Sequence, residues 1–259
     1  MIDIHHHCLP GVDDGPRNLE EAVDLCRLAA ADGIETIIAT PHVLRGRWQN
    51  TSRELLEEKL AELQAAVGAT PRLVLGSEYF FAHDMTDSLR KGTIVPLAGS
   101  RYVLVEFASH AVPPLVEQPL YQARLGGWTP IIAHPERNLV FQSKPELLAS
   151  LVANGSKTQV TASSLLGEFG PQARDCAAEW IEREMVHFVA SDAHNRAKRP
   201  PQMSEASEVL REIAGADVAD ALTRHNPAAV LENHGLPYDP EPKPAPKRGV
   251  FDRLSKFWK

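Results

Sequence analysis

The chain has 259 residues, of which 43% are hydrophobic and 24% are charged, and its formal net charge is −7. This length allows one large core, and the acidic charge argues against a nucleic-acid backbone as the partner, because proteins that bind one normally carry a strongly basic face. No apolar stretch approaches the roughly 20 residues needed to span a bilayer and no signal-peptide pattern opens the chain, so we expect a cytoplasmic protein.

Seven short apolar runs alternate with stretches of helical period along the chain. The runs cover residues 2–5, 35–42, 72–79, 102–107, 129–137, 157–162 and 187–194. Helices are predicted near residues 19–32, 52–67, 114–125, 145–154, 172–184 and 204–214. Nearly continuous apolar strands that alternate with helices favour the α/β class with a parallel sheet, either open or closed into a barrel.

Three helix starts have recognisable sequence signals. Asn18 with Glu21 and Thr51 with Glu54 match the capping-box pattern, in which a polar side chain accepts a hydrogen bond from the first turn. Asn226 before Pro227 is typical of an N-cap followed by proline at the first helical position.

The composition changes at residue 237. The segment PYDPEPKPAPKRG is rich in proline and polar residues, which predicts an extended linker without a core. The segment 250–259 can place apolar side chains opposite basic ones, and it can bind an anionic membrane surface or a partner's groove; a frayed or folded-back tail is an equal alternative. We therefore expect a folded domain at 1–236 and a linker and basic tail at 237–259.

The three cysteines do not indicate a disulfide framework or a zinc knuckle, because their number is odd and none belongs to a CxxC pair. None is followed six positions later by arginine, which excludes the Cys-x5-Arg phosphate cradle of thiol phosphatases. The motifs GxxxxGK[ST], GxSxG and HExxH are also absent. Any chemistry must therefore be built from other residues.

The first run contains three consecutive histidines, and six of the seven runs end in a residue that can bind a metal ion. Strand periodicity places His5 and His7 on one side and His6 on the other. The full set is His5, His7, His42, Glu78, Glu106, His134, Asp192 and His194, with Asp14 shortly after the first run. A single such residue is more often structural, but their recurrence at strand ends predicts a shared site, because parallel strands of a barrel end on one rim.

Several carboxylates at close range resist ionisation unless cations neutralise them. Mixed nitrogen and oxygen ligands favour Mn, Fe or Zn over Ca or Mg. Several metal ions about 3.5–4 Å apart are a common solution for the hydrolysis of phosphate esters. The strand ends therefore predict a metal-dependent phosphoesterase.

The motifs that carry these residues resemble a known superfamily. HHH within MIDIHHHCLPGVDDG, then IIATPH, GSEYF, VLVEF, IIAHPERN and ASDAHN, are similar in order and spacing to the polymerase and histidinol phosphatase (PHP) superfamily. Within it, residues 1 to about 235 resemble the bacterial tyrosine-protein phosphatases typified by CpsB and YwqE, which are encoded with capsule and exopolysaccharide machinery. The resemblance implies a distorted (β/α)7 barrel, and the sequence departs from it at His6, where relatives usually carry a small or polar residue.

The resemblance also implies a site with three divalent ions, first of all Mn, with Fe, Co or Zn as alternatives. His5, His7, Glu78 and Asp192 would hold the first ion, Glu78 would bridge to a second bound by Glu106 and His134, and Asp14, His42 and His194 would hold the third. Arg137 and Arg199 match positions where the family places arginines near the substrate phosphate, which a guanidinium binds in a bidentate way. With Asp14, they are the candidate catalytic residues.

The loop at 43–50 carries Arg45, Arg47 and Trp48 and lies on the expected rim. It can contact the acidic or aromatic flank of a phosphopeptide, with Arg47 as a candidate substrate-binding residue, or it can be an exposed loop with no specific role. The remaining histidines are interpreted as structural or surface residues, although His110 can border the pocket: His83, His110, His187, His225 and His234.

The implied reaction is hydrolysis of phosphotyrosine on a protein, such as a bacterial tyrosine kinase that controls capsule or exopolysaccharide synthesis, through attack of a metal-activated hydroxide on phosphorus. One alternative keeps the site but changes the substrate, to a small molecule such as histidinol phosphate or to a nucleic-acid phosphodiester. Another is a non-catalytic adaptor that the tail recruits to a membrane kinase. A cytoplasmic location, peripheral at the inner membrane, suits the first and the last.

Overall fold

The structure is a computed structural model that describes residues 1–244. The predicted amphipathic segment at 250–259 lies outside the described residues. Within residues 1–244, no helix combines the length and the apolar composition that crossing a membrane requires.

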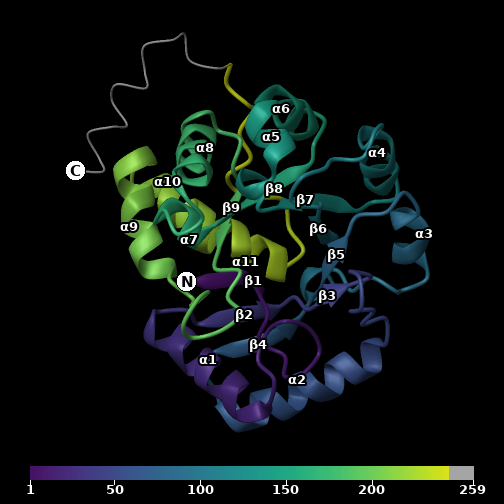
Figure 1. Cartoon of the computed structure of the whole chain (residues 1–259), viewed down its shortest axis with the longest axis vertical. Coiled ribbons are helices and arrows are strands. Elements are labelled where there is room, and N and C mark those ends of the chain that lie inside the picture. Colours follow the sequence, from purple (N-terminus) through teal and green to yellow (C-terminus); the bar gives the residue numbers. More distant parts are fainter. Residues whose placement is uncertain (245–259) are drawn as a thin grey trace.

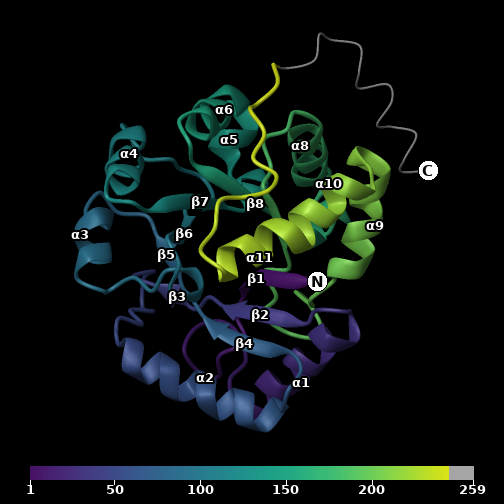
Figure 2. The ribbon, with the colours of Figure 1, turned by 180° about the vertical axis from the view of Figure 1, so that it is seen from behind.

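The strands form two parallel sheets, of order β1-β2-β4 and β3-β5-β6-β7-β8-β9, as Figures 1 and 2 show. The strands are β1 (Ile2–His6), β2 (Thr36–Ala39), β3 (His42–Val43), β4 (Arg72–Leu75), β5 (Glu78–Phe80), β6 (Tyr102–Glu106), β7 (Thr129–Ala133), β8 (Lys157–Thr161) and β9 (Phe188–Ala190). Every pairing between them is parallel. The predicted α/β class with parallel sheets is confirmed.

Two of the predicted apolar runs are each divided between the two sheets. The run at 35–42 breaks at Thr40 and Pro41 into β2 and β3, and the run at 72–79 breaks at Gly76 and Ser77 into β4 and β5. The sheets also meet where the backbone N–H of His7 donates to the carbonyl of Ala193 at 2.9 Å. The first strand is thus joined both to β2 and to the segment that follows β9.

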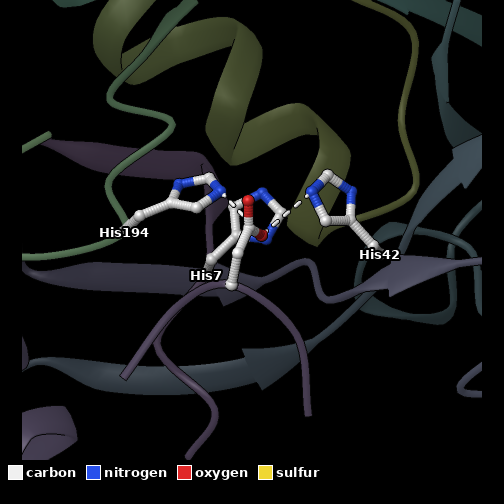
Figure 3. Close-up of side chains that lie close together, drawn as sticks. His7, His42 and His194 are labelled. Carbon is white, nitrogen blue, oxygen red and sulfur yellow. Dashed lines mark ion pairs between the residues drawn. The ribbon is translucent and has the colours of Figure 1, made fainter. Parts of the chain in front are cut away.

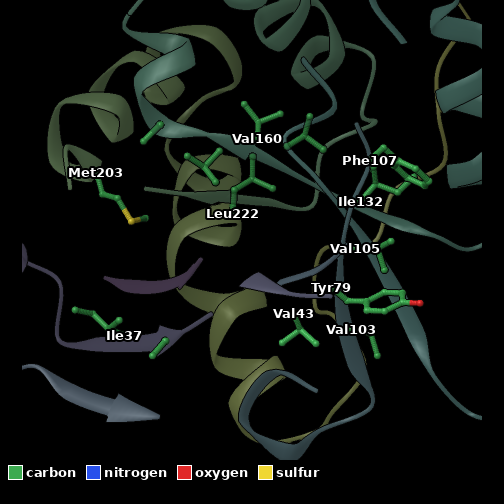
Figure 4. Close-up of a cluster of buried hydrophobic side chains, with 14 of the residues drawn as sticks. Ile37, Val43, Tyr79, Val103, Val105, Phe107, Ile132, Val160, Met203 and Leu222 are labelled. Atoms are coloured by element: carbon green, nitrogen blue, oxygen red, sulfur yellow. The ribbon is translucent and has the colours of Figure 1, made fainter. Parts of the chain in front are cut away.

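The strands are buried on both faces, as expected for parallel strands between other layers. On β6, Val103 and Val105 pack into an outer core beneath the helices, part of which Figure 4 shows. Tyr102 and Leu104, which alternate with them, belong to a separate inner core. The inner core is formed by Ile4, Ile38, Leu97, Tyr102, Leu104, Ile131, Ala133, Phe188, Ala190 and Val230.

Helices cover the outer faces of the strands, with α1 and α2 beside the smaller sheet (Figure 1). The helices are α1 (Leu19–Ala31), α2 (Arg53–Val67), α3 (Met85–Arg90), α4 (Glu117–Leu125), α5 (Leu139–Ser143), α6 (Pro145–Ala153), α7 (Ala162–Leu165), α8 (Pro171–Glu182), α9 (Met203–Ala214), α10 (Ala216–Asp220) and α11 (Asn226–Leu231). The described residues also form two short 3₁₀ turns, η1 (Leu97–Gly99) and η2 (Pro135–Arg137), and a π-helical turn, η3 (Ala221–His225).

The helix starts correct two of the three predicted caps. Asn18 caps α1 as predicted, because its side chain accepts from the N–H of Glu21. The cap of α2 is Ser52, which accepts from the N–H of Leu55, and not Thr51. Asn226 is not an N-cap, because η3 runs into α11 without a break.

The side chain of Asn226 instead holds the segment after α11 against the domain. Its amide donates to the carbonyls of His187 and Tyr238, at 2.9 and 2.7 Å, and its oxygen accepts from the N–H of Tyr238 at 3.0 Å. Further along this segment, Asp239 pairs with Lys157, and the N–H of Lys243 donates to the carbonyl of Arg183. Residues 237–244, expected to be a linker without a core, are therefore irregular but attached.

Replacement of Asn226 should destabilise the fold. In Asn226→Ala, the half-buried N–H of Tyr238 and two carbonyls lose their partners, and we expect the free energy of unfolding to fall by about 2–4 kcal/mol. Urea denaturation followed by circular dichroism measures this change. The matched control is Asn154→Ala, since the side chain of Asn154 is exposed and makes one long hydrogen bond of 3.5 Å. Equal midpoints for the two variants would contradict the assignment.

Candidate metal centre

The ends of the strands bring all nine predicted metal-binding residues together. Ligand atoms of these residues form four overlapping groups, each within 4.8 Å, that can hold a metal ion. The groups are His7, Asp14, His42 and His194; His5, His134 and Asp192; His5, His7 and Glu78; and His42, Glu78 and Glu106. Eight of the nine residues are buried, and Asp14 is the exposed member.

Glu78 is the centre of this arrangement. Its carboxylate is fully buried and meets four imidazole rings, with His42 Nδ1 at 2.8 Å, His134 Nε2 at 2.9 Å, and the Nε2 atoms of His5 and His7 both at 3.4 Å. No arginine or lysine pairs with Glu78 among the described residues. Burial would raise the pKa of Glu78, but the neighbouring His5 and His42 hold this pKa well below its usual range.

Hydrogen bonds at the far nitrogen of three rings determine which nitrogen faces the centre. The Nδ1–H of His5 donates to Gln159 Oε1, and that of His7 donates to Asp13 Oδ2, both at 2.8 Å. The Nδ1–H of His194 donates to the carbonyl of Asp192 at 2.9 Å. In the neutral form of each ring, these hydrogen bonds leave the lone pair on Nε2, which is the arrangement typical of metal-binding histidines.

Figure 3 shows the rings of His7, His42 and His194 close together. The carboxylate of Asp14 belongs to the same group. Asp14 Oδ1 is 3.2 Å from His42 Nε2 and 3.3 Å from His194 Nε2. The ring centres of His7 and His194 are only 3.9 Å apart. Asp14 thus connects two strand ends to the loop that follows β1.

The unpaired atoms of the site test whether cations fit it. His5 Nε2 and His7 Nε2, both with a lone pair, face each other at 3.2 Å. Within residues 1–244, the buried atoms Glu78 Oε2, Glu106 Oε2 and His194 Nε2 make no well-aligned hydrogen bond. Their nearest charged or polar neighbours are His42 Nδ1, Arg45 Nε and Asp14 Oδ1, at 2.8, 2.8 and 3.3 Å. Burial, and then the charge of Glu78, raise the pKa of Glu106 to about 7. Divalent cations among these atoms would satisfy the lone pairs and remove the repulsion, so the residues fit metal ions.

The position of His134 differs in detail from the ligand sets that the family resemblance implies. His134 shares a group with His5 and Asp192, while His42 shares one with Glu78 and Glu106. Burial, followed by the positive charge of Arg137, lowers the pKa of His134 to about 3, which keeps this ring neutral. A neutral imidazole is the form that binds metal ions.

Arg137 and Arg199 converge on the same carboxylate. Arg137 Nη2 donates to Asp192 Oδ2 at 2.5 Å, and Arg199 Nη2 donates to the same oxygen. Both side chains line a cavity of about 290 Å³ that also contains His42, Glu78, Glu106 and His134. The structure therefore places two guanidinium groups beside the metal-binding groups.

The loop after β3 presents Arg45, and not Arg47, to this cavity. Arg45 Nε lies 2.8 Å from Glu106 Oε2, and Arg45 Nη1 donates to His42 Nε2 at 2.7 Å. Arg47 lies over the ring of Trp48 at 4.9 Å and lines a second cavity, beside Asp14 and His194. Trp48 in turn stacks on His42, with ring centres 5.4 Å apart. Arg47 is therefore separated from Arg137 and Arg199.

The other histidines do not join the site. His83, His110, His225 and His234 are exposed, and the neighbour of His110, Ser109, lines the first cavity in its place. His187 is buried immediately before β9, at the end of the strand away from Asp192, and pairs with Asp239. His6 is also buried, and desolvation lowers its pKa to about 3.

Two residues that orient the histidines, Asp13 and Gln159, were not among the sequence candidates. Asp13 accepts from His7 and also from the backbone N–H groups of Gly15 and His42, at 2.9 and 3.1 Å. Gln159 lies on β8 opposite Ala133, the residue before His134. Asp13 is the first of two consecutive aspartates, and Gln159 is a polar residue in an apolar run, so both left a weak signal.

The backbone is strained at two site residues. His134 has φ of 32° and Asp192 has φ of 52°, values that residues other than glycine seldom adopt. Strain of this kind persists only where the surrounding structure imposes it, and it is concentrated at functional sites. From these backbone positions, His134 contacts Glu78, and Asp192 contacts Arg137 and Arg199.

Comparisons with known proteins show which family this chain is similar to. A family model described as "Capsular polysaccharide synthesis, CpsB/CapC" matches residues 1–232. Tyrosine-protein phosphatase YwqE of Bacillus subtilis is 35% identical over 97% of this chain and 99% of its own length. Tyrosine-protein phosphatase CpsB of Streptococcus pneumoniae is 32% identical over 89% of this chain and 98% of its own length.

A solved structure resembles the whole fold. It is described as crystal structures of YwqE from Bacillus subtilis and CpsB from Streptococcus pneumoniae, "unique metal-dependent tyrosine phosphatases". The TM-score is 0.91 at 34% identity, and the match covers 95% of this chain and all of that one.

Loss of the Asp13 carboxylate should weaken metal binding. In Asp13→Ala, His7 loses the acceptor that orients its ring, and we expect the dissociation constant for Mn²⁺ to rise roughly 10- to 100-fold. Calorimetric titration of chelator-treated protein measures this constant. The control is Asp24→Ala, since Asp24 pairs with Arg196 at the surface. Unchanged affinity in Asp13→Ala would contradict the role given to this carboxylate.

Proposed function

Because the chain belongs to the CpsB/CapC family of capsular polysaccharide synthesis proteins, we propose that it is a metal-dependent protein-tyrosine phosphatase. The observation that carries this proposal is the buried Glu78 carboxylate, which meets four imidazole rings and, within residues 1–244, no arginine or lysine. A structural ion pair would need only one or two of these rings. A carboxylate that bridges two metal ions would be surrounded by several, because each ion takes further ligands of its own.

We assign the nine residues to three divalent ions, with Mn as the first choice and Fe, Co or Zn as alternatives. His5, His7, Glu78 and Asp192 would hold one ion, and Glu78, Glu106 and His134 would hold the second, although it is His42 that groups with Glu78 and Glu106. Asp14, His42 and His194 would hold the third. Such ions lower the pKa of a water molecule and neutralise phosphoryl oxygens.

The chain's own residues hold and orient the phosphate. Arg137 and Arg199 supply positive charge and N–H groups on one side of the metal-binding groups, and both now donate to Asp192. A substrate phosphate in the cavity offers them new acceptors, and guanidinium groups bind phosphate oxygens in pairs. The exposed Asp14 lines the second cavity and contacts His42, which lines the first, so it would hold an ion where water has access.

The loop at 43–50 contributes to recognition through two different arginines. Arg45 reaches the same cavity as Arg137, and its guanidinium is the nearest additional cation for the phosphate. Arg47 lies on the other side of Asp14, where it suits contact with the protein that carries the phosphotyrosine. The proposed protein partner is a bacterial tyrosine kinase that controls capsule or exopolysaccharide synthesis.

The barrel and the domain boundary belong to the same proposal. Seven strand runs that pair in chain order, with β1 bonded to the segment after β9, support a distorted (β/α)7 barrel. The inner core, drawn from β1, β2, β6, β7 and β9, supports it as well. We place the catalytic domain at residues 1–236.

A panel of substrates tests this function. We expect the Mn-loaded protein to hydrolyse a phosphotyrosine peptide in preference to histidinol phosphate and single-stranded DNA, with activity lost on chelation. In His42→Ala, kcat/KM should fall roughly 100-fold or more, because the cavity loses a ligand that faces Glu78. His110→Ala is the control, since His110 is exposed outside the site.

Other outcomes of the panel would replace the proposal. Faster turnover of histidinol phosphate or DNA would indicate one of the other phosphoesterases. No turnover of any substrate, together with unfolding on chelation, would indicate an adaptor in which the ions only stabilise the fold.

Arg137→Lys should retain charge but lose phosphate binding. A lysine cannot offer two parallel N–H groups, and the loss of one charge-assisted hydrogen bond lowers kcat/KM for the phosphotyrosine peptide by roughly 10- to 100-fold. Steady-state kinetics at saturating Mn²⁺ measures the change. Arg53→Lys is the matched control, because Arg53 pairs with Glu57 on the surface of α2. A similar rate for both variants would remove Arg137 from the phosphate site.

A further inference from the structure

The cavity that holds Arg137 and Arg199 has one polar wall and one aromatic wall. The polar wall consists of the metal-binding groups and the arginines. The aromatic wall contains three phenylalanines, Phe107, Phe141 and Phe169. The proposed function uses the polar wall and leaves the three rings without a role.

Phe107 and Phe141 are fixed parts of this wall. Phe107 is 5% exposed and Phe141 is fully buried, and their rings meet edge to face with centres 5.9 Å apart. Asn138 holds the two segments together, because its oxygen accepts from the N–H of Phe141 while its amide donates to the carbonyl of Ala108. The two rings therefore keep their positions whether or not a ligand is present.

Phe169 is different, because 37% of it is exposed at the cavity. One face of its ring is covered by the guanidinium of Arg137, whose central carbon is 4.6 Å from the ring centre. Arg137 itself reaches Asp192 among the metal-binding groups. An aromatic surface is therefore in direct contact with the guanidinium that would bind a phosphate.

The loop that carries Phe169 is held in place by its own backbone. Gly167 and Gly170 flank it with φ of 85° and 88°, which lets the chain turn sharply on both sides. The N–H of Glu168 donates to the carbonyl of Ser163, and the N–H of Gly170 donates to the carbonyl of Gly167, both at 3.0 Å. The ring is thus presented to the cavity by a turn with internal hydrogen bonds.

We propose that Phe169 and Phe107, with Phe141 packed behind Phe107, form an aromatic slot that receives the ring of an aryl phosphate and makes the site prefer aryl over alkyl phosphate monoesters. An aryl ring bonded to the phosphate oxygen fills this wall when the phosphate meets Arg137, and ring contacts of this kind are favourable. The side chain of phosphoserine is too short to cover the wall. This inference rests on the proposed function and identifies Phe169 as a specificity-determining residue.

The test compares ligands that differ only in the group next to phosphorus. Calorimetry measures binding of phenylphosphonate and methylphosphonate, and kinetics measures kcat/KM for one peptide that carries either phosphotyrosine or phosphoserine. In Phe169→Ala we expect roughly a tenfold loss for phenylphosphonate and the phosphotyrosine peptide. We expect less than about a twofold change for methylphosphonate and the phosphoserine peptide, because a phosphate contact is unaffected by this wall.

Two controls keep the result specific. Leu125→Ala removes an exposed apolar side chain, 64% exposed at the end of α4 and outside the cavity, and should change neither ligand. Phe169→Leu retains most of the apolar volume and should lose less than Phe169→Ala. Thermal unfolding shows whether Phe169→Ala folds. If it does not, the same ligands are compared with Phe169→Leu.

The outcomes separate this inference from the proposed function. Equal losses for both phosphonates would overturn the slot, since Phe169 would then act only by positioning Arg137, and so would no loss for either. If the wild-type protein hydrolyses neither peptide, the proposed function fails. In that case a preference for phenylphosphonate that disappears in Phe169→Ala still supports the slot, and equal binding of the two phosphonates overturns it.

Discussion

The neutralisation of a buried carboxylate is the constraint on which the rest of the site depends. Glu78 is 1% exposed, and its neighbours are imidazoles whose lone pairs also point inward. A group of acceptors of this kind is unfavourable in a protein interior unless cations join it. The inward positions of the other acceptors and the backbone at His134 and Asp192 fit this requirement, while the two arginines neutralise Asp192.

The parallel strands make this convergence possible, but ideal strands would not be sufficient. The register of β1 against β2 shifts between Asp3 and His6, so that three steps along β1 match two along β2. A bulge of this kind re-aims side chains near active sites. Gly15 has a similar function in the next loop, since a Cβ there would lie 2.3 Å from the carbonyl of His7. Asp14 reaches His42 only because the backbone approaches so closely.

The sequence predicted which residues gather at the strand ends better than it predicted the contacts and backbone breaks that orient them. Each ligand ends or follows an apolar run, so its place on the rim followed from strand periodicity and the family resemblance. The breaks at Pro41 and Gly76 were not predictable, because the apolar pattern continues through them.

Gly76 has a steric role that the pattern did not reveal, since a Cβ there would meet side-chain atoms of Ile38 and Leu97 at 2.9 Å. The choice between Arg45 and Arg47 depends on positive φ angles at Leu44 and Gly46, which no residue pattern revealed. Gln159 could not be found from local sequence, because it meets His5 across 154 residues.

The pairing of the first strand with the last has a consequence for biosynthesis. Asp3 accepts hydrogen bonds from Ser191, 188 residues away, and His5 and His7 need Asp192 beside them. A ribosome that has released β1 must add most of the domain before these partners exist, and contacts of such long sequence separation form late. The nascent histidines therefore cannot meet all their partners until the chain has been synthesised past the ninth strand, and binding of a cation by the full set would have to follow that point.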